Sequence, residues 1–123
     1  MVLRVARHTE QLQALVDFYT LIPGIEVLGD FQSHDGYDGV FLGMKNENWH
    51  LEFTTSNHEA KHNPDPDDLL VFYLEDVDAL NEAGSILKHR GHLEQQSRNP
   101  YWNLRSLLFI DPDGFGLVLS VKK

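Results

Sequence analysis

The 123-residue sequence contains no cysteine. This absence excludes disulfide bonds, thiolate metal sites and cysteine nucleophiles, and it is consistent with a reducing compartment. No apolar run approaches the roughly 18 residues that a membrane-spanning helix needs. The N-terminal stretch MVLRVARHTE also lacks the apolar segment of a secretory signal. We therefore expect a cytoplasmic protein that does not bind a membrane.

Basic residues are few. The chain has 10 Lys and Arg against 19 Asp and Glu, which gives a formal net charge of −9. Binding to a phosphate backbone requires clustered Lys and Arg, and here they are scattered, so we expect no nucleic-acid partner. Glycine loops that cradle phosphate and a serine in a nucleophile-elbow context are also missing. The apolar fraction of 41% is nevertheless enough for the core of a single domain.

What the sequence does contain is one pattern of elements, repeated. Alternating or continuous apolar stretches predict strands at 2–6, 25–31, 37–43 and 49–55, and again at 69–74, 92–97, 105–110 and 116–121. Apolar residues at helical spacing predict a helix after each first strand, capped by Thr9 and by Asp76. Gly91 ends the second helix, and DPDG at 111–114 makes a tight turn.

The halves align at an offset of 66 residues, which places Leu3 on Leu69 and Glu52 on Val118. We therefore expect one α+β domain over 1–123, built from tandem βαβββ modules at 1–55 and 69–121 and a polar linker at 56–68. The modules are expected to form a curled eight-stranded mixed sheet around a cavity, with the helices outside. Such a concave face is a common place for a small ligand.

Several stretches resemble a known family. DFYTLIPGIEVLGDF (17–31), VFYLEDVDALNEAGSILKHRG (71–91) and the closing hairpin DPDGFGLVLS (111–120) are similar to the vicinal oxygen chelate superfamily, which includes glyoxalases, bleomycin resistance proteins and extradiol dioxygenases. HDGYDGV, WHLEFT, DLLVFY and NPYW further resemble a bacterial subset of unassigned function. The resemblance covers nearly the whole chain.

The resemblance implies a divalent metal held by residues on the first and last strand of each module. The matching positions in this chain are Arg4, Glu52, Leu69 and Val118, of which only Glu52 is a usual ligand. A protein site needs at least three ligands, and His50 would add a second to Glu52 only if it turned inward. We therefore expect no cofactor and no family-type metal, and we expect Arg4 to pair with Glu52 where a metal would lie.

Three further stretches allow two readings each. HEAKH (58–62) matches the zinc-protease pattern, but it lies in the polar linker without the required helical context. SHDGYDGV (33–40) is read as an Asp-Gly turn, or as a cavity rim with His34, Tyr37 or Asp38 as hydrogen-bonding groups. Tyr101 and Trp102 in RNPYWN (98–103) suit a pocket wall or lid, and they suit a dimer contact equally well.

His50 is either a packed strand residue or a group that acts in the pocket. Three functions follow. The first is a metal-free small-molecule-binding protein whose pocket candidates are Arg4, Tyr37, His50, Glu52, Tyr101 and Trp102. The second is a metal-dependent lyase, isomerase, transferase or dioxygenase on the family plan. The third is a metal-free enzyme with His50 or Glu52 as general base. We favour the first, in a homodimer by analogy of fold, and the sequence does not identify the ligand or separate the first function from the third.

Overall fold

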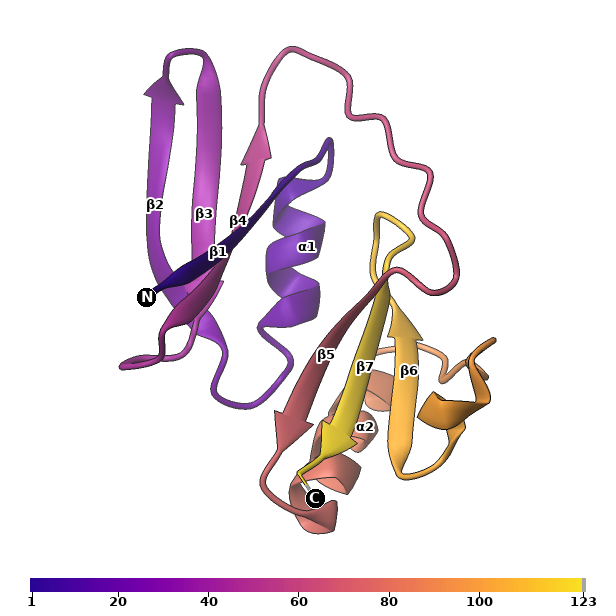
Figure 1. Ribbon diagram of the computed structural model, residues 1–123. Helices are drawn as coiled ribbons and strands as arrows, with labels where there is room; N and C mark the ends of the chain where they lie inside the picture. The colour runs from indigo at the N-terminus through magenta and orange to yellow at the C-terminus, as the bar shows by residue number, and fades with distance from the viewer. Residues whose placement is uncertain (123) are drawn as a thin grey trace. The chain divides into compact units, whose positions relative to one another are not determined.

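The computed structural model describes residues 1–122, which form two compact units, Met1–Lys61 and a second unit from His62 onward (Figure 1). The first unit contains β1 (Leu3–His8), α1 (Leu12–Tyr19), β2 (Glu26–His34), β3 (Tyr37–Gly43) and β4 (Trp49–Thr55). The second contains β5 (Leu69–Leu74), α2 (Val77–His89), the 3₁₀ helix η1 (Pro100–Asn103), β6 (Ser106–Ile110) and β7 (Gly116–Val121). The α+β class is confirmed, and no described helix has the length and apolar character to cross a membrane.

The first unit is a four-stranded sheet with one helix on one face. The strand order is β1-β4-β3-β2, with β1 parallel to β4 and the other pairs antiparallel. Alternation along β4 places Leu51 and Phe53 on the side of α1, where both are buried. The Phe53 ring stacks on Tyr19 of α1, with the ring centroids 5.4 Å apart. His50 and Glu52 therefore lie on the face that α1 does not cover.

The β2–β3 hairpin confirms the predicted Asp-Gly turn. Asp35 and Gly36 both have positive φ, 52° and 86°, as a two-residue type I′ turn requires. Asp38 Oδ1 accepts a hydrogen bond from the backbone N–H of Ser33 at 2.8 Å. The pairing register shifts twice along the hairpin, between Phe31 and His34 and between Val27 and Gly29. These two bulges decide which β2 side chains share a face with Glu52.

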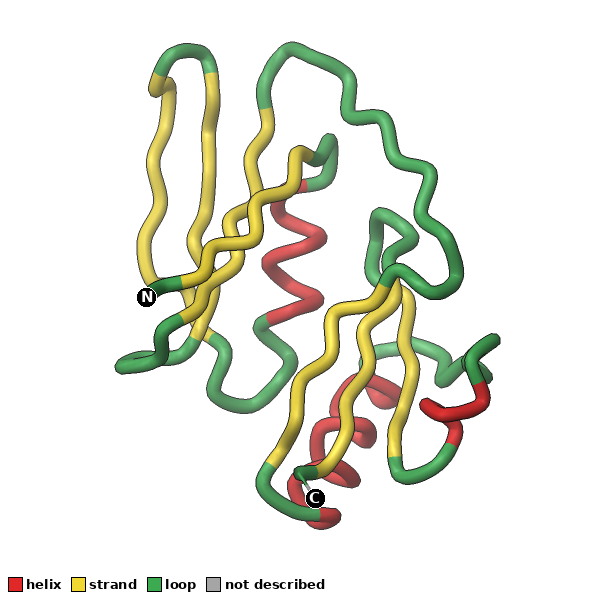
Figure 2. The backbone as a smooth tube through the Cα atoms, in the orientation of Figure 1, coloured by secondary structure: helices red, strands yellow, loops and turns green. Residues whose placement is uncertain are grey.

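The second unit repeats the first with one strand fewer. Its sheet has the order β5-β7-β6, with α2 on one face (Figure 2). The predicted strand at 92–97 is wrong, because this segment makes only an isolated bridge from Gln95 to Leu108. At the end of this segment, the Asn103 amide accepts from the Ser97 N–H and donates to the Ser97 C=O, so these two backbone groups pair with a side chain and not with a strand. The described strands thus form a four-stranded and a three-stranded sheet, and the expected single eight-stranded curled sheet is not found.

The helix ends follow the sequence signals in part. Asp76 caps α2 as predicted, because its Oδ1 accepts from the Ala79 N–H at 2.8 Å. Gly91 has φ of 90° and ends α2. Thr9 is not the N-cap of α1, since that helix begins one residue after Gln11. Thr9 Oγ1 accepts instead from the Gln11 N–H at 2.9 Å and so makes the turn that leads into the helix.

The polar segment 56–68 has neither helix nor strand, but both of its ends are fastened. Ser56 is hydrogen-bonded to His8 in the first unit. In the second unit, Arg98 donates hydrogen bonds to the carboxylates of Asp65 and Asp67. Because residues 58–62 are not helical, the His-Glu-x-x-His pattern lacks the geometry that a zinc protease needs.

Candidate functional site

A cluster of charged and aromatic side chains lies on the face of the first sheet that α1 leaves uncovered. We call this surface, made by Arg4, Phe31, Phe41, His50 and Glu52, the Arg4 face. Arg4 of β1 is the register partner of His50 in β4, and Phe41 of β3 is the partner of Glu52. Partners in a sheet point to the same side, so three strands that are adjacent in the sheet bring these groups together.

The guanidinium of Arg4 is the centre of the cluster. Its Nε–H donates a hydrogen bond of 2.8 Å to His50 Nε2, and its Nη1 lies 3.8 Å from Glu52 Oε2. The guanidinium carbon is 4.8 Å from the centroid of the Phe41 ring, within the range of a cation–π contact. The expected pairing of Arg4 with Glu52 is therefore present. Arg4 is half exposed (51%) and Glu52 largely buried (14%), so the carboxylate depends more than the guanidinium on having a partner.

The hydrogen bond from Arg4 also orients His50. An arginine N–H can only donate, so Nε2 of the imidazole accepts and the ring proton is assigned to Nδ1. The imidazole meets the Phe41 ring edge to face, with the ring centroids 5.8 Å apart. His50 is thus held by one polar and one aromatic contact. Its Nε2 lone pair, which a general base would use, is occupied by the Arg4 N–H.

Two aromatic residues of the Arg4 face, Phe31 and Phe41, were not identified from the sequence. Their ring centroids are 5.8 Å apart, and both side chains are half-buried. The Phe31 ring lies over Gly39, where an added Cβ would come 2.3 Å from the ring. Glycine thus allows the ring to lie against β3. The only sequence signal for this packing was a glycine, Gly39, inside the predicted strand at 37–43.

The four positions at which the resemblance implies metal ligands do not fit a divalent ion. In the second unit, Leu69 pairs with Gly116 and Val71 pairs with Val118. This register makes Leu69 the equivalent of Arg4, so the sequence alignment of Leu3 with Leu69 is one residue out. The set is one guanidinium, one carboxylate and two aliphatic side chains, which supplies a single metal donor. Within residues 1–122, no three His, Cys, Asp or Glu side chains are grouped as a metal site.

Tyr37 belongs to a different cluster, at the hairpin end of the first sheet. Its ring meets the imidazole of His8 edge to face, with the centroids 5.7 Å apart. His8 Nδ1 lies 3.1 Å from Thr54 Oγ1, and its Nε2 lies 3.1 Å from Ser56 Oγ and 3.2 Å from the His58 carbonyl. Because that carbonyl can only accept, the pattern assigns the proton to Nε2. His8 therefore holds the start of the segment 56–68 and does not activate Ser56.

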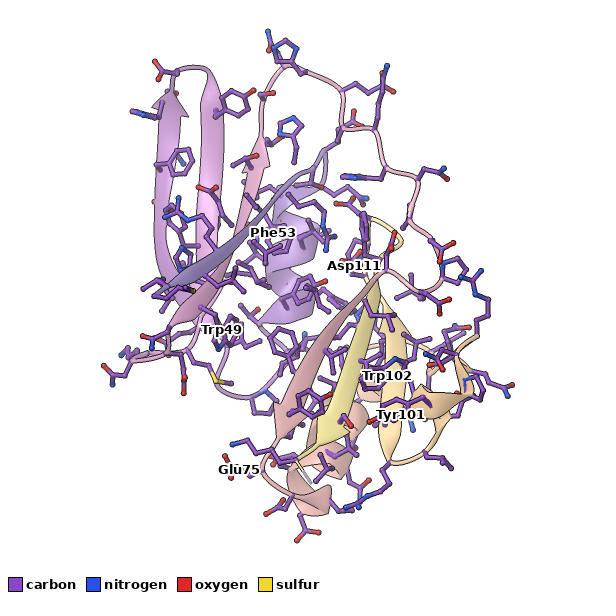
Figure 3. The ribbon with its side chains drawn as sticks, in the orientation of Figure 1. Trp49, Phe53, Glu75, Tyr101, Trp102 and Asp111 are labelled. Atoms are coloured by element: carbon purple, nitrogen blue, oxygen red, sulfur yellow. The ribbon has the colours of Figure 1, made fainter. Side chains whose placement is uncertain are left out.

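Tyr101 and Trp102 lie in the second unit, on the short 3₁₀ helix η1 (Figure 3). Asn99 caps this helix, because its side chain accepts from the Tyr101 N–H at 3.1 Å. The two rings are perpendicular, with their centroids 4.8 Å apart, and Tyr101 is 55% exposed. The structure thus groups three of the six candidates, Arg4, His50 and Glu52, and finds Tyr37 in another cluster of the same unit.

Comparison with known proteins agrees with this architecture. A model of a YycE-like N-terminal domain matches residues 3–54, and a model of a YycE-like C-terminal domain matches residues 67–121. The uncharacterised protein YycE of Bacillus subtilis (strain 168) is 39% identical over 122 residues, which cover 98% of this chain and 88% of the relative. The chain belongs to the YycE-like family. The function of YycE is not known, so membership in the YycE-like family does not by itself assign an activity.

Solved structures place the YycE-like chain in the glyoxalase and fosfomycin or bleomycin resistance fold. The crystal structure of B. subtilis YycE has a TM-score of 0.89 at 39% identity and covers 99% of this chain and 90% of its own. Trypanothione-dependent glyoxalase I of Leishmania major has a TM-score of 0.75 at 20% identity, with coverages of 98% and 86%. The antibiotic-binding protein TnmS3 of Streptomyces sp. CB03234 has a TM-score of 0.71 at 22% identity, with coverages of 100% and 96%. The last two similarities concern the fold alone.

Proposed function

We propose that this YycE-like protein binds a small organic molecule on the Arg4 face and does so without a divalent metal ion. The observation that carries the proposal is the place of the Arg4 guanidinium, which lies between His50 and Glu52 at one of the positions where the family resemblance implies a metal ligand. A guanidinium stays protonated at every physiological pH. It therefore supplies a permanent positive charge next to Glu52, where a metal would otherwise supply it.

Electrostatics supports this reading. A divalent ion at Glu52 would lie within a few ångströms of the guanidinium, and like charges at such distances repel. The ion would also have to lose water without gaining enough protein donors in return. The Arg4 guanidinium avoids both costs, because it needs no dehydrated ligand shell and already has two polar partners and an aromatic one.

A metal-free enzyme with His50 as general base is less well supported. A general base must offer a lone pair to the substrate proton, and the lone pair on His50 Nε2 accepts the Arg4 hydrogen bond. Glu52 is paired with the same guanidinium, and its carboxylate oxygens are acceptors for a ligand N–H or O–H. In a binding role, His50 and Glu52 can keep the contacts with Arg4 that they make in the structure.

Fold relatives are compatible with a binding role. One is an antibiotic-binding protein, and another is the fosfomycin resistance protein FosX of Mesorhizobium loti, at a TM-score of 0.71 and 11% identity. These relatives show that the fold is used in proteins that handle small organic molecules. The residues of the Arg4 face, and not the fold, carry the proposal for this chain.

Metal analysis tests the metal-free part of the proposal. The protein, purified without chelators, is measured by inductively coupled plasma mass spectrometry. Its thermal unfolding is followed with and without Mg²⁺, Mn²⁺, Ni²⁺ and Zn²⁺. We expect substoichiometric metal and no stabilisation by any of the ions, since an ion that binds only the native state would raise the unfolding temperature. A stoichiometric ion that is lost on substitution of Glu52 by Gln would contradict the proposal.

A further inference from the structure

The polar groups of the Arg4 face are balanced in charge. Arg4 carries one positive charge, and Glu52 carries one negative charge 3.8 Å away. Arg4 uses its Nε–H on His50, which leaves the N–H groups of the guanidinium end for other acceptors. Glu52 has oxygen lone pairs and no proton to donate. A ligand group that accepts from Arg4 and also donates to Glu52 would satisfy both residues.

An anionic ligand would satisfy only one of them. An anion bound to the Arg4 guanidinium would lie close to the Glu52 carboxylate, and the two negative charges would repel each other. Glu52 is largely buried, so water screens this repulsion only in part. The formal net charge of −9 adds a weaker unfavourable field for anions. A phosphonate or carboxylate therefore fits this site less well than an uncharged group.

The apolar part of the site is aromatic. The Phe31 and Phe41 rings lie side by side on the face, and the guanidinium covers part of Phe41. Both rings are half-buried, so each has an exposed part that a planar ring can contact by offset stacking or edge to face. The polar pair lies at one end of this aromatic surface.

We infer that the ligand of the Arg4 face is an uncharged aromatic amide, with its ring on Phe31 and Phe41, its carbonyl oxygen on Arg4 and its N–H on Glu52. This inference rests on the proposed function, because it names the ligand class of the same site. A carboxamide places an acceptor and a donor side by side on one planar group, which is what the paired guanidinium and carboxylate require.

Three probes with the same ring test the inference: benzamide, benzoate and phenylphosphonate. Each is titrated at millimolar concentration into the isotope-labelled full chain, and backbone amide shifts are followed by heteronuclear NMR near neutral pH. Benzamide is expected to shift the amides of Arg4, Phe41 and Glu52 and to bind more tightly than benzoate, whose carboxylate the Glu52 charge repels. Phenylphosphonate should bind more weakly still. Acetamide, which has no ring, controls for the aromatic contribution.

The variant Glu52→Gln tests whether the charge of Glu52 disfavours anionic ligands. It removes the negative charge but keeps the size of the side chain, so benzoate should bind E52Q more tightly than it binds the wild type. Tighter binding of benzoate or phenylphosphonate than of benzamide to the wild type would overturn the inferred ligand class and leave the binding site in place. If none of the three aromatic probes shifts these amides, both the ligand class and the proposed site are wrong.

Discussion

Single residues decide the chemistry of the Arg4 face. An arginine in the place of a metal ligand converts a position for coordination into one for hydrogen bonding and ion pairing. The ion pair with Glu52 is partly exposed and 3.8 Å long, so its direct contribution to stability is small. We infer that Arg4 serves mainly to give the largely buried Glu52 a partner and to orient His50 for a ligand.

A double-mutant cycle measures this pair. We expect Arg4→Met and Glu52→Gln each to lower the free energy of unfolding modestly, with a coupling energy of about 0.5 kcal/mol between them, as for other partly exposed pairs. Urea denaturation of the four proteins gives the coupling, which should shrink in concentrated NaCl because salt screens exposed charges. A coupling near zero at low salt would show that the pair does not contribute to stability. Phe53→Ala gives a large effect for comparison, since loss of this buried ring should lower the free energy of unfolding by about 3–5 kcal/mol.

Gly39 controls the position of the Phe31 ring. We expect Gly39→Ala to push the ring off β3, because the added methyl group would lie 2.3 Å from it. The Phe31 ring is only half-buried, so the stability loss should stay near the lower end of the roughly 1–3 kcal/mol typical of overpacking. Altered ring-current shifts at Phe41, measured by NMR, would report the displacement. Gly36→Ala is a contrasting control, because nothing lies within 4 Å of its added Cβ and only the positive φ opposes the change.

At the level of elements, the repeated module is visible in both the sequence and the structure. Each unit has a first strand parallel to its last strand and a helix that follows the first strand. The strands at 37–43, 49–55, 69–74 and 116–121 have the predicted bounds. Their alternating or continuous apolar pattern is a local property, and for this reason the sequence alone reveals it.

The N-cap of α2 allows a direct test of one element. We expect Asp76→Ala to lower the free energy of unfolding by about 1 kcal/mol, because the Ala79 N–H would lose its acceptor at the helix start. Glu82→Ala, an exposed change within the same helix, should have an effect close to zero. Chemical denaturation of both variants makes the comparison. Equal effects would show that the cap contributes nothing beyond helix propensity.

At the scale of the whole molecule, the homodimer remains a prediction. The fold analogy supports it, because such modules often complete their sites by pairing. Size-exclusion chromatography with multi-angle light scattering should give twice the 14.1 kDa of one chain across a wide range of protein concentration. A constant mass of one chain would contradict the prediction. The Arg4 face would remain, since all of its residues come from one unit.

The sequence by itself determined the two-module plan, most of the helices and strands, the Asp76 cap and the Asp-Gly turn. It also determined the presence of Arg4, Leu69 and Val118 where the family resemblance implies metal ligands. These features depend on local patterns and on residue identity. Only the tertiary structure decided that 92–97 is not a strand: the segment makes an isolated bridge from Gln95 to Leu108, and the backbone of its last residue, Ser97, pairs with the side chain of Asn103.

The aromatic part of the site was likewise decided by tertiary structure. A regular two-residue hairpin would place Phe31 opposite Val40, on the side of α1, whereas the bulge places it opposite Gly39 and on the Arg4 face. A shift of one residue in register reverses the direction of every side chain beyond it. Register depends on pairing between distant strands and on which face is buried, so the spacing of residues along one strand does not reveal it.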